Sequence, residues 1–210
     1  MTSTSDTPTR QPCCGAKVIT FCVITLAVAL GLGSAWVWTE YLQTYHLATV
    51  QPGVLYRDGN RGLREFQTAV RNTKPKTVVS LIDDNELADP HKPMFAQEID
   101  WCRQQGVNVV RIPVKLGGWP STEDVRKFLD VVRDKNNQPV LVHCAQGVRR
   151  TGMFVAAYQE SVLGWDDAKV KSSLLTFGHS KRTVKDVERF VDVYNAKDKA
   201  VTAQLEPSEE

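Results

Sequence analysis

The chain has 210 residues, of which 42% are hydrophobic and 24% are charged, and its formal net charge at pH 7 is +2. This composition is typical of one globular domain with additional segments, and the small net charge gives no indication of nucleic-acid binding. The five cysteines are irregularly spaced and form no Cys-x-x-Cys or Cys/His cluster, which argues against a disulfide framework and predicts no bound metal.

The N-terminal part of the chain contains one long uncharged stretch. Residues 1–17 are mostly polar, and we predict that they form a disordered head. Residues 18–38 (VITFCVITLAVALGLGSAWVW) carry no charge, and as a helix they would span about 31 Å, the thickness of the hydrocarbon core of a bilayer. We therefore expect a single-pass transmembrane anchor. A cleaved secretory signal is the alternative, because the Gly-Ser-Ala at 33–35 suits a cleavage site.

The charges on either side of this stretch favour one orientation in a membrane. Arg10 and Lys17 precede it, whereas no Lys or Arg follows it before Arg57. The positive-inside rule therefore predicts a cytoplasmic N-terminus and a C-terminal region on the other, non-cytoplasmic side. A difference of two charges leaves the opposite orientation open.

The rest of the chain has the pattern of an α/β domain. Residues 39–52 are predicted to form a linker, residues 53–196 a folded domain and residues 197–210 a polar tail. Strand-like and helix-like segments alternate in the domain, which predicts a mainly parallel sheet flanked by helices. Functional sites gather at the carboxyl ends of the strands of such sheets. The predicted strands are 53–58, 76–82, 107–114 and 138–144, and the predicted helices are 61–72, 93–106, 121–134, 150–163, 166–177 and 183–196.

The segment HCAQGVRRTG at 143–152 follows the last predicted strand and leads into a helix. A loop in this position can turn its backbone N–H groups inward and bind an anion at the helix N-terminus. The same N–H groups stabilise a thiolate, so we expect the pKa of Cys144 to be lowered. The planar guanidinium of Arg150 can bind two phosphate oxygens, and Gly147 permits the backbone geometry that the loop needs. The predicted phosphate-binding loop comprises Ala145, Gln146, Gly147, Val148, Arg149 and Arg150.

These groups together predict covalent catalysis on a phosphate ester. The Cys144 thiolate would attack phosphorus, while the backbone N–H groups and Arg150 stabilise the charge on the phosphate oxygens. Water would then release the phosphate. The hydroxyl of Thr151 is placed to donate a hydrogen bond to the sulfur in that second step, and we expect His143 to orient the loop rather than to react.

The same segment resembles the HCxxGxxRTG signature of the cysteine-dependent protein tyrosine and dual-specificity phosphatases. A weaker resemblance runs from GVLYRDGN at 53–60 to about Val193, and it is closest to the small atypical dual-specificity group. The resemblance implies a parallel sheet flanked by helices, no metal and no organic cofactor. It also implies that Cys144 is the nucleophile, Arg150 the phosphate-binding arginine and Thr151 the hydroxyl that assists the sulfur.

One residue that this family usually carries is missing. Its members have a general-acid Asp in the loop before the helix that precedes the last strand, but the loop 114–124 (VKLGGWPSTED) has Lys-Leu at the expected place. The remaining candidates are Asp124, at the start of that helix, and Asp83 and Asp84, which follow another strand. A favourable first-turn charge and a solvated turn are the alternative interpretations of these residues. Without an acid, alkyl phosphates would be hydrolysed slowly.

The sequence leaves the substrate and several functions open. The substrate is expected to be a phosphorylated protein or a small phosphorylated molecule, and Arg149 could select a multiply charged one such as an inositol phosphate or a phosphoinositide. A catalytically weak phosphate-binding module and a rhodanese-like sulfurtransferase are the alternatives to a phosphatase. We expect no nucleic-acid partner and a membrane partner through the N-terminal helix, and the sequence predicts no oligomeric state.

Overall fold

The computed structural model describes residues 14–37, 46–175 and 181–201, and the chain divides into two compact units, Met1–Leu42 and Gln43–Glu210. Parts of five predicted segments lie outside the described residues. These are residues 1–13 of the predicted head, 38 of the anchor, 39–45 of the linker, 176–177 of the predicted helix 166–177 and 202–210 of the predicted tail.

In the described part of the first unit there is one helix, α1 (Cys14–Val37). Its segment Val18–Ala35 is long and apolar enough to cross a membrane, with a mean hydropathy of 2.3, and a signal sequence would pass the same test. The hydroxyls of Thr25 and Ser34 donate to carbonyl oxygens of the preceding turn, which satisfies polar groups that hydrocarbon would penalise. The helix begins at Cys14 rather than at residue 18, so it includes the end of the predicted head.

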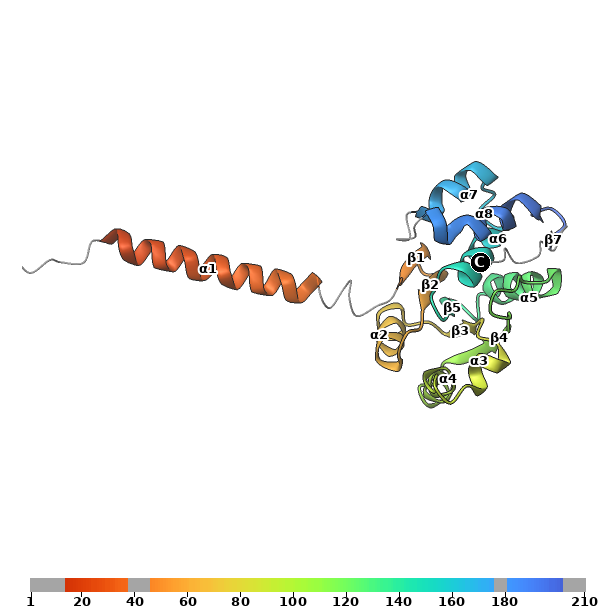
Figure 1. Ribbon diagram of the computed structural model, residues 1–210, viewed down its shortest axis with the longest axis horizontal. Coiled ribbons are helices and arrows are strands. Elements are labelled where there is room, and N and C mark those ends of the chain that lie inside the picture. The colour runs from red at the N-terminus through yellow and green to blue at the C-terminus, as the bar shows by residue number, and fades with distance from the viewer. Residues whose placement is uncertain (1–13, 38–45, 176–180, 202–210) are drawn as a thin grey trace, which may run out of the picture. The chain divides into compact units, whose positions relative to one another are not determined.

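The second unit is built on a five-stranded sheet with the order β1-β2-β5-β3-β4 (Figure 1). Its strands β2, β5, β3 and β4 are parallel, and the edge strand β1 is antiparallel to β2. The prediction of a mainly parallel sheet flanked by helices is thus confirmed. The strands are β1 (Ala48–Gln51), β2 (Leu55–Gly59), β3 (Thr77–Ser80), β4 (Asn108–Arg111) and β5 (Val140–Cys144).

Helices cover both faces of this sheet (Figure 1). Alternate residues of β5, such as Val142 and Cys144, pack with helices α5, α6, α7 and α8 in the larger core. Leu141 points to the opposite face, where a smaller core contains Phe66 and Cys102 of α2 and α4. The helices are α2 (Leu63–Thr73), α3 (Asp84–Ala88), α4 (Met94–Gln104), α5 (Thr122–Arg133), α6 (Arg149–Ser161), α7 (Asp167–Leu174) and α8 (Lys181–Val193).

Helix α6 lies deepest in the second unit. Every residue from Arg150 to Glu160 is buried, and Phe154 packs edge to face against Phe128 of α5. A Cβ on Gly152 would lie 2.9 Å from the side chain of Val187, so a glycine at this position allows α8 to lie close to α6. The buried helix therefore holds its own N-terminus rigidly at the end of β5.

Four elements differ from the predicted ones. Strand β1 lies inside the predicted linker, and it is short and pairs only at the sheet edge, so the sequence carries no apolar run to reveal it. Helix α3 replaces the turn that was one interpretation of residues 83–86. The short strands β6 (Tyr194–Asn195) and β7 (Ala200–Val201) form an antiparallel pair, and β7 falls in the predicted tail.

Candidate active site

The loop between β5 and α6 closes in four residues, from Cys144 to Arg149. Gly147 in this loop has a φ of +68°, and a Cβ there would lie 2.6 Å from the carbonyl oxygen of Asp58. Gly59, at the end of β2, packs against the same loop, and a Cβ on Gly59 would lie 2.5 Å from the carbonyl carbon of Gln146. The two glycines allow the end of β2 to touch the loop backbone directly. This contact fixes the shape of the loop.

The side chain of Cys144 lies within this loop and is 3% exposed. The backbone N–H of Gly147 donates to Sγ at 3.2 Å. Burial by itself raises the pKa of a thiol, but the Arg150 guanidinium, the Thr151 hydroxyl and backbone N–H groups outweigh it and hold the pKa of the Cys144 thiol below its usual value. The Thr151 hydroxyl is buried and bonds to no oxygen or nitrogen of the described residues, so it is left to act on the sulfur.

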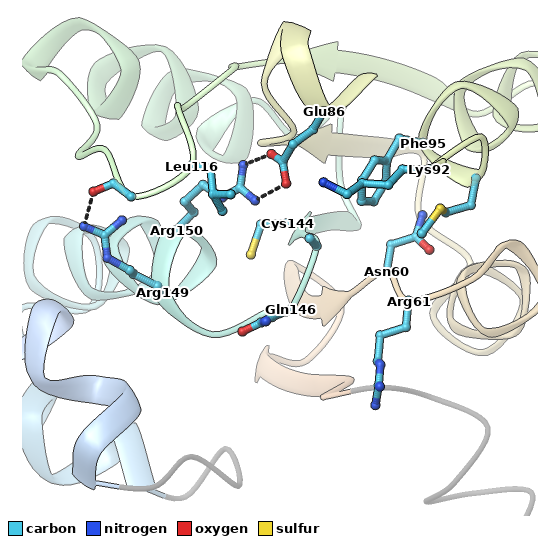
Figure 2. Close-up of a pocket in the computed structure, with 13 residues that line it drawn as sticks. Asn60, Arg61, Glu86, Lys92, Phe95, Leu116, Cys144, Gln146, Arg149 and Arg150 are labelled. Carbon is cyan, nitrogen blue, oxygen red and sulfur yellow. Dashed lines mark hydrogen bonds and ion pairs between the residues drawn. The ribbon is translucent and has the colours of Figure 1, made fainter. Parts of the chain in front are cut away.

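The guanidinium of Arg150 is held by a carboxylate that the sequence analysis did not single out. Glu86, on α3, accepts hydrogen bonds from Nη1 at 2.5 Å and from Nη2 at 3.1 Å (Figure 2). Nη1 also donates to the carbonyl oxygens of Leu81 and Val114, at 3.2 and 3.0 Å. Both partners of the ion pair are buried. This two-point contact fixes the plane of the guanidinium beside Cys144.

Local capping explains why Glu86 reaches this position. Oδ1 of Asp83 accepts the backbone N–H of Glu86 at 2.8 Å, and the Glu86 carboxylate accepts the N–H of Asp83 at 3.4 Å. This capping box starts α3 and points the first turn of the helix toward Arg150. An acidic residue followed three positions later by Glu is a known sequence signal for a helix start, and it could have identified α3.

Asp83, the first of the three acid candidates, is a poor proton donor in this environment. Its Oδ2 accepts the backbone N–H of Leu116 at 2.9 Å, so both carboxylate oxygens are engaged. Burial raises the pKa of a carboxyl, but backbone N–H groups and the charge of Arg150 outweigh it and hold the pKa of Asp83 below its usual value. A general acid at neutral pH requires the opposite shift.

The other two acid candidates are engaged elsewhere. Asp84 has a side chain that is 76% exposed, and it pairs with Arg111 at 2.9 Å. Asp124 caps α5, because its Oδ2 accepts the backbone N–H and the hydroxyl of Ser121, at 2.9 and 2.7 Å. Neither carboxylate lines the pocket beside Cys144. The structure therefore does not bring the acid candidates together with the thiol.

A pocket of about 420 Å³ lies over Cys144 (Figure 2). Apolar side chains of Met94, Phe95 and Leu116 form part of its wall. Glu86, paired with Arg150, is the one carboxylate among the residues that line it, all of which belong to the described part of the chain. These residues are Asn60, Arg61, Glu86, Lys92, Met94, Phe95, Leu116, Gly117, Cys144, Ala145, Gln146, Arg149 and Arg150.

Arg149 borders the pocket, but its guanidinium is already engaged. Nε donates to the carboxylate of Asp186 on α8 at 2.5 Å. Nη2 donates to the carbonyl oxygen of Gly117, the dashed line at Arg149 in Figure 2, and Nη1 donates to that of Gly118, each at 2.7 Å. These contacts direct the side chain to the loop 115–118 rather than to a bound anion.

His143 projects from the face of the sheet opposite to Cys144. Its Nε2 lies 3.3 Å from Oε1 of Glu98 on α4, and both side chains are buried. Glu98 also accepts hydrogen bonds from the hydroxyl of Ser80, at 3.1 Å, and from the amide of Asn60. Burial lowers the pKa of an imidazole, but the charge of Glu98 outweighs it and raises the pKa of His143. The network places His143 where it can orient the strand that ends in Cys144.

Two charged residues of β2 lie buried beside the loop, and the sequence analysis did not predict them. Nη2 of Arg57 donates to the carbonyl oxygen of Gly147 at 2.6 Å. Asp58 is fully buried, and neither of its carboxylate oxygens has a hydrogen-bond partner among the described residues. Burial raises the pKa of Asp58 to about 8 although the charge of His143 opposes it, so this carboxyl is mostly protonated at neutral pH. The sequence signal that could have identified these two residues is the presence of charged side chains at the carboxyl end of a predicted strand.

Comparisons with known proteins give a matching family model and several relatives. A family model described as "DSP-PTPase phosphatase fused to NAD+ Kinase" matches residues 70–189. The dual-specificity protein phosphatase TpbA of Pseudomonas aeruginosa is 34% identical over 91 residues, which are 43% of this chain and 36% of that protein. The chain thus spans less than half the length of this curated relative.

Solved structures give longer matches. A crystal structure of P. aeruginosa TpbA matches with a TM-score of 0.58 and 25% identity, and covers 74% of this chain and 88% of that one. Another structure of TpbA, in complex with phosphotyrosine, matches with the same TM-score at 24% identity. The core catalytic domain of the PP-IP phosphatase SIW14 from S. cerevisiae matches with a TM-score of 0.59 over 72% of this chain and 87% of that one, and its 19% identity shows the fold alone.

Proposed function

The chain belongs to the dual-specificity and protein tyrosine phosphatase family described by the matching model, and on that premise we propose that it hydrolyses phosphate monoesters through a cysteinyl-phosphate intermediate. One observation carries the proposal. The Cys144 thiol, with a lowered pKa, lies at the N-terminus of a buried helix beside the guanidinium that Glu86 holds at two points. This arrangement supplies a nucleophile and a site for three phosphate oxygens within one loop.

In the first step of the proposed reaction, the Cys144 thiolate attacks phosphorus in line with the leaving oxygen. The S–P bond forms, the P–O bond breaks, and the leaving oxygen takes its electron pair. Arg150 and the backbone N–H groups of the loop stabilise the charge on the three remaining oxygens. No carboxylate of the described residues stands free in the pocket to protonate the leaving oxygen, so it takes its proton from solvent or leaves as an anion.

In the second step, water attacks phosphorus and the P–S bond breaks. The electron pair of that bond returns to sulfur, and the water proton passes to phosphate or solvent. The Thr151 hydroxyl, which has no other partner among the described residues, donates to the sulfur as negative charge develops there. Phosphate then leaves the loop and the thiolate is restored.

The pocket favours an aryl phosphate as substrate. Phe95, Met94 and Leu116 offer apolar surface near Cys144, where the ring of a phosphotyrosine would be buried from water. An aryl oxygen also leaves with little need of a proton. The complex of the related TpbA with phosphotyrosine supports this choice, and we propose a dual-specificity protein phosphatase that acts best on phosphotyrosine.

A small polyphosphate is the second candidate substrate. Arg61 and Lys92 line the same pocket beside the phosphate-binding loop, and they place two further cations there. Lys92 is partly neutralised by Asp89 at 3.4 Å, which weakens the case. The similarity in fold to the PP-IP phosphatase SIW14 supports inositol phosphates as the class to compare with phosphotyrosine.

We also propose that α1 anchors this domain to a membrane as a single-pass helix. The length and apolarity of Val18–Ala35 support the proposal. The flanking charges favour a domain on the non-cytoplasmic side. Protease protection of sealed vesicles would test the orientation, and an N-terminal sequence that begins after residue 35 would identify a cleaved signal instead.

The substitution Cys144→Ser in the full chain, kept in detergent, tests the phosphatase. We expect hydrolysis of 4-nitrophenyl phosphate to fall by roughly 10³-fold or more, while orthovanadate still binds, because the N–H groups and Arg150 remain. Cys102→Ser is the matched control, since Cys102 is also fully buried but lies in the opposite core, where burial raises its pKa to about 12. Residual turnover within about tenfold of the unmodified protein would exclude Cys144 as the nucleophile. Turnover of thiosulfate without phosphate release would identify a sulfurtransferase.

A further inference from the structure

We propose that Arg149 is a positioning residue that ties the loop 115–118 to the phosphate-binding loop and so fixes the leaving-group side of the pocket. The proposal rests on the proposed phosphatase function. It gives Arg149 a role within the protein, whereas the sequence analysis linked this residue to the selection of a multiply charged substrate. It is supported by the contacts of Arg149, by the composition of the loop 115–118 and by the source of that loop's other contacts.

The first support is the geometry of the Arg149 guanidinium. Arg149 follows Val148 in the phosphate-binding loop, but its guanidinium points away from Cys144 (Figure 2). All three of its nitrogens donate to protein oxygens, one to the Asp186 carboxylate and two to consecutive carbonyl groups of Gly117 and Gly118. A planar guanidinium suits this set of three acceptors. Binding a substrate phosphate would require these hydrogen bonds to break.

The second support is that the loop 115–118 has little to hold its own shape. Its sequence is Lys-Leu-Gly-Gly, and Gly117 has a φ of +77°. The side chain of Leu116 is 70% exposed, so burial does not anchor it. One internal hydrogen bond closes the turn, from the N–H of Gly118 to the carbonyl of Lys115 at 2.8 Å. Two successive glycines lose much conformational freedom when they become ordered, and contacts from outside the loop must offset that cost.

The third support is where those outside contacts come from. Asp83 accepts the N–H of Leu116 at 2.9 Å, and Arg150 donates to the carbonyl of Val114 at 3.0 Å. Arg149 adds the two bonds to the glycine carbonyls. The two consecutive arginines of the phosphate-binding loop therefore hold both ends of this segment. Asp186 holds Arg149 from α8, so the contact is braced on both sides.

The consequence concerns substrate binding. Leu116 and Gly117 line the pocket beside Cys144, where the leaving group of a phosphate ester would lie. A segment already fixed in this place spares each binding event the entropy of ordering it. The loop 115–118 has no carboxylate, and we propose that it contributes shape to the pocket in which the leaving group lies.

The substitution Arg149→Lys in the full chain tests the proposal, because lysine keeps the charge but carries it on one nitrogen, which cannot reach the three acceptors that lie around the planar guanidinium. We expect amide hydrogen exchange of residues 116–118 to accelerate by about tenfold or more. We expect KM for 4-nitrophenyl phosphate to rise about fivefold, with the inhibition constant of orthovanadate changed by less than about twofold, since orthovanadate has no leaving group to contact the loop.

Two further variants make the result specific. Asp186→Asn removes the charge from one of the three contacts and so weakens it, which should give intermediate exchange, and it serves if Arg149→Lys fails to fold. Arg103→Lys is the matched control, because Arg103 is exposed and pairs only with Asp100 at 3.3 Å in the hydrogen bonds and ion pairs of the described residues. Exchange at 116–118 in this control should equal that of the unmodified protein.

Two results would overturn the proposal. Unchanged exchange at 116–118 in both Arg149→Lys and Asp186→Asn would show that the loop does not depend on Arg149. A parallel loss of orthovanadate affinity and of substrate affinity would show that Arg149 binds the phosphate group itself. Exchange is measured without turnover, so an inactive unmodified protein would contradict the proposed function and would leave the loop contact to be judged by exchange.

Discussion

The two faces of the central sheet treat charged groups differently near Cys144. On the face from which Cys144 projects, Arg150 and Arg149 each bond to a carboxylate and to backbone carbonyls. On the opposite face, Asp58 and His143 are buried beneath α2 and α4, and Asp58 has no hydrogen-bond partner among the described residues. On the first face, hydrogen bonds fix the positions of the charged side chains. On the second face, the ionisable groups are buried in a low-dielectric environment.

This difference indicates separate contributions to one thiolate. Bidentate and three-point contacts of the arginines determine where the oxygens of a phosphate can lie. The buried groups add a smaller influence on negative charge at Cys144, because each interacts with it electrostatically. A raised pKa keeps His143 more cationic, and a raised pKa keeps Asp58 neutral. Both effects favour the thiolate over the thiol.

The largest effect should come from disrupting the ion pair between Glu86 and Arg150. Glu86→Gln leaves the buried guanidinium of Arg150 with a neutral partner and a less defined plane. Because the guanidinium is then less well placed for the phosphate oxygens, we expect kcat/KM for 4-nitrophenyl phosphate to fall by roughly 10²- to 10³-fold. Steady-state kinetics on the two proteins would measure this loss.

A double variant shows whether Glu86 acts through Arg150. If its only role is to orient the guanidinium, then Glu86→Gln combined with Arg150→Lys should be no slower than Arg150→Lys alone. Full additivity of the two losses in activation free energy would show that Glu86 contributes independently to the reaction.

The next largest effect should come from Gly147, where the backbone of β2 at Asp58 touches the phosphate-binding loop. Gly147→Ala forces a side chain into the left-handed region at φ +68° and places Cβ 2.6 Å from the carbonyl oxygen of Asp58. We expect the free energy of unfolding to fall by about 2–4 kcal/mol. Gly53→Ala is the control, because Gly53 has a φ of +72° but no atom within 4 Å of the new Cβ. It should cost about 1 kcal/mol, and equal losses for the two variants would show that backbone conformation alone matters at Gly147.

The sequence predicts the groups on the Cys144 face of the sheet better than the buried ionisable groups on the opposite face, for a physical reason. Cys144, Gly147 and Arg150 lie within one short loop, so their spacing alone brings them together. Glu86 lies far from them along the chain, and its meeting with Arg150 depends on the parallel arrangement of β3 beside β5. Spacing along the chain cannot show such a contact.

The buried groups are harder still to predict. Asp58 lies in a segment that reads as a strand followed by a turn, where a charged residue is ordinarily solvated. Its burial follows from α2 and α4 covering that end of the sheet, and from the close approach of Gly59 to the phosphate-binding loop. For the general acid the sequence was informative in a different way, because the loop 114–124 has no Asp before the helix start, and this could be read directly.

Asp58→Asn should have a smaller effect that depends on pH. The folded protein holds a proton on Asp58 up to a pKa of about 8, whereas the unfolded chain releases it near the usual 3.8. Folded molecules therefore bind more protons than unfolded ones between these values, and stability falls as pH rises through this window. Asparagine cannot ionise, so we expect the stability of the variant relative to the unmodified protein to rise by about 1–3 kcal/mol from pH 5 to pH 8.

Glu160 provides the comparison for Asp58. It is also buried, and burial together with the charge of Asp167 raises its pKa to about 8, but it lies near the C-terminal end of α6, away from Cys144. Glu160→Gln should flatten the dependence of stability on pH in the same direction and leave kcat/KM unchanged. Asp58→Asn should in addition raise kcat/KM above pH 8, because an ionised Asp58 would repel the Cys144 thiolate. Identical activity profiles for the two variants would contradict a role of Asp58 at the thiolate.

The smallest effect should come from the acid candidates outside the pocket. Asp84 pairs with Arg111 in solvent and Asp124 caps α5 through Ser121. Asp84→Asn and Asp124→Asn should each change kcat/KM by less than about twofold, on alkyl and on aryl phosphates alike, because a true acid contributes about 10²- to 10⁴-fold. In the unmodified protein, rates on a series of aryl phosphates should fall steeply as the pKa of the leaving phenol rises, since no proton reaches the leaving oxygen in the transition state. A flat series would show that an efficient acid is present. If one of the two variants then lost activity mainly on alkyl phosphates and lost the alkaline limb of its pH profile, that aspartate would be the acid, and its loop would have to move toward Cys144 when substrate binds.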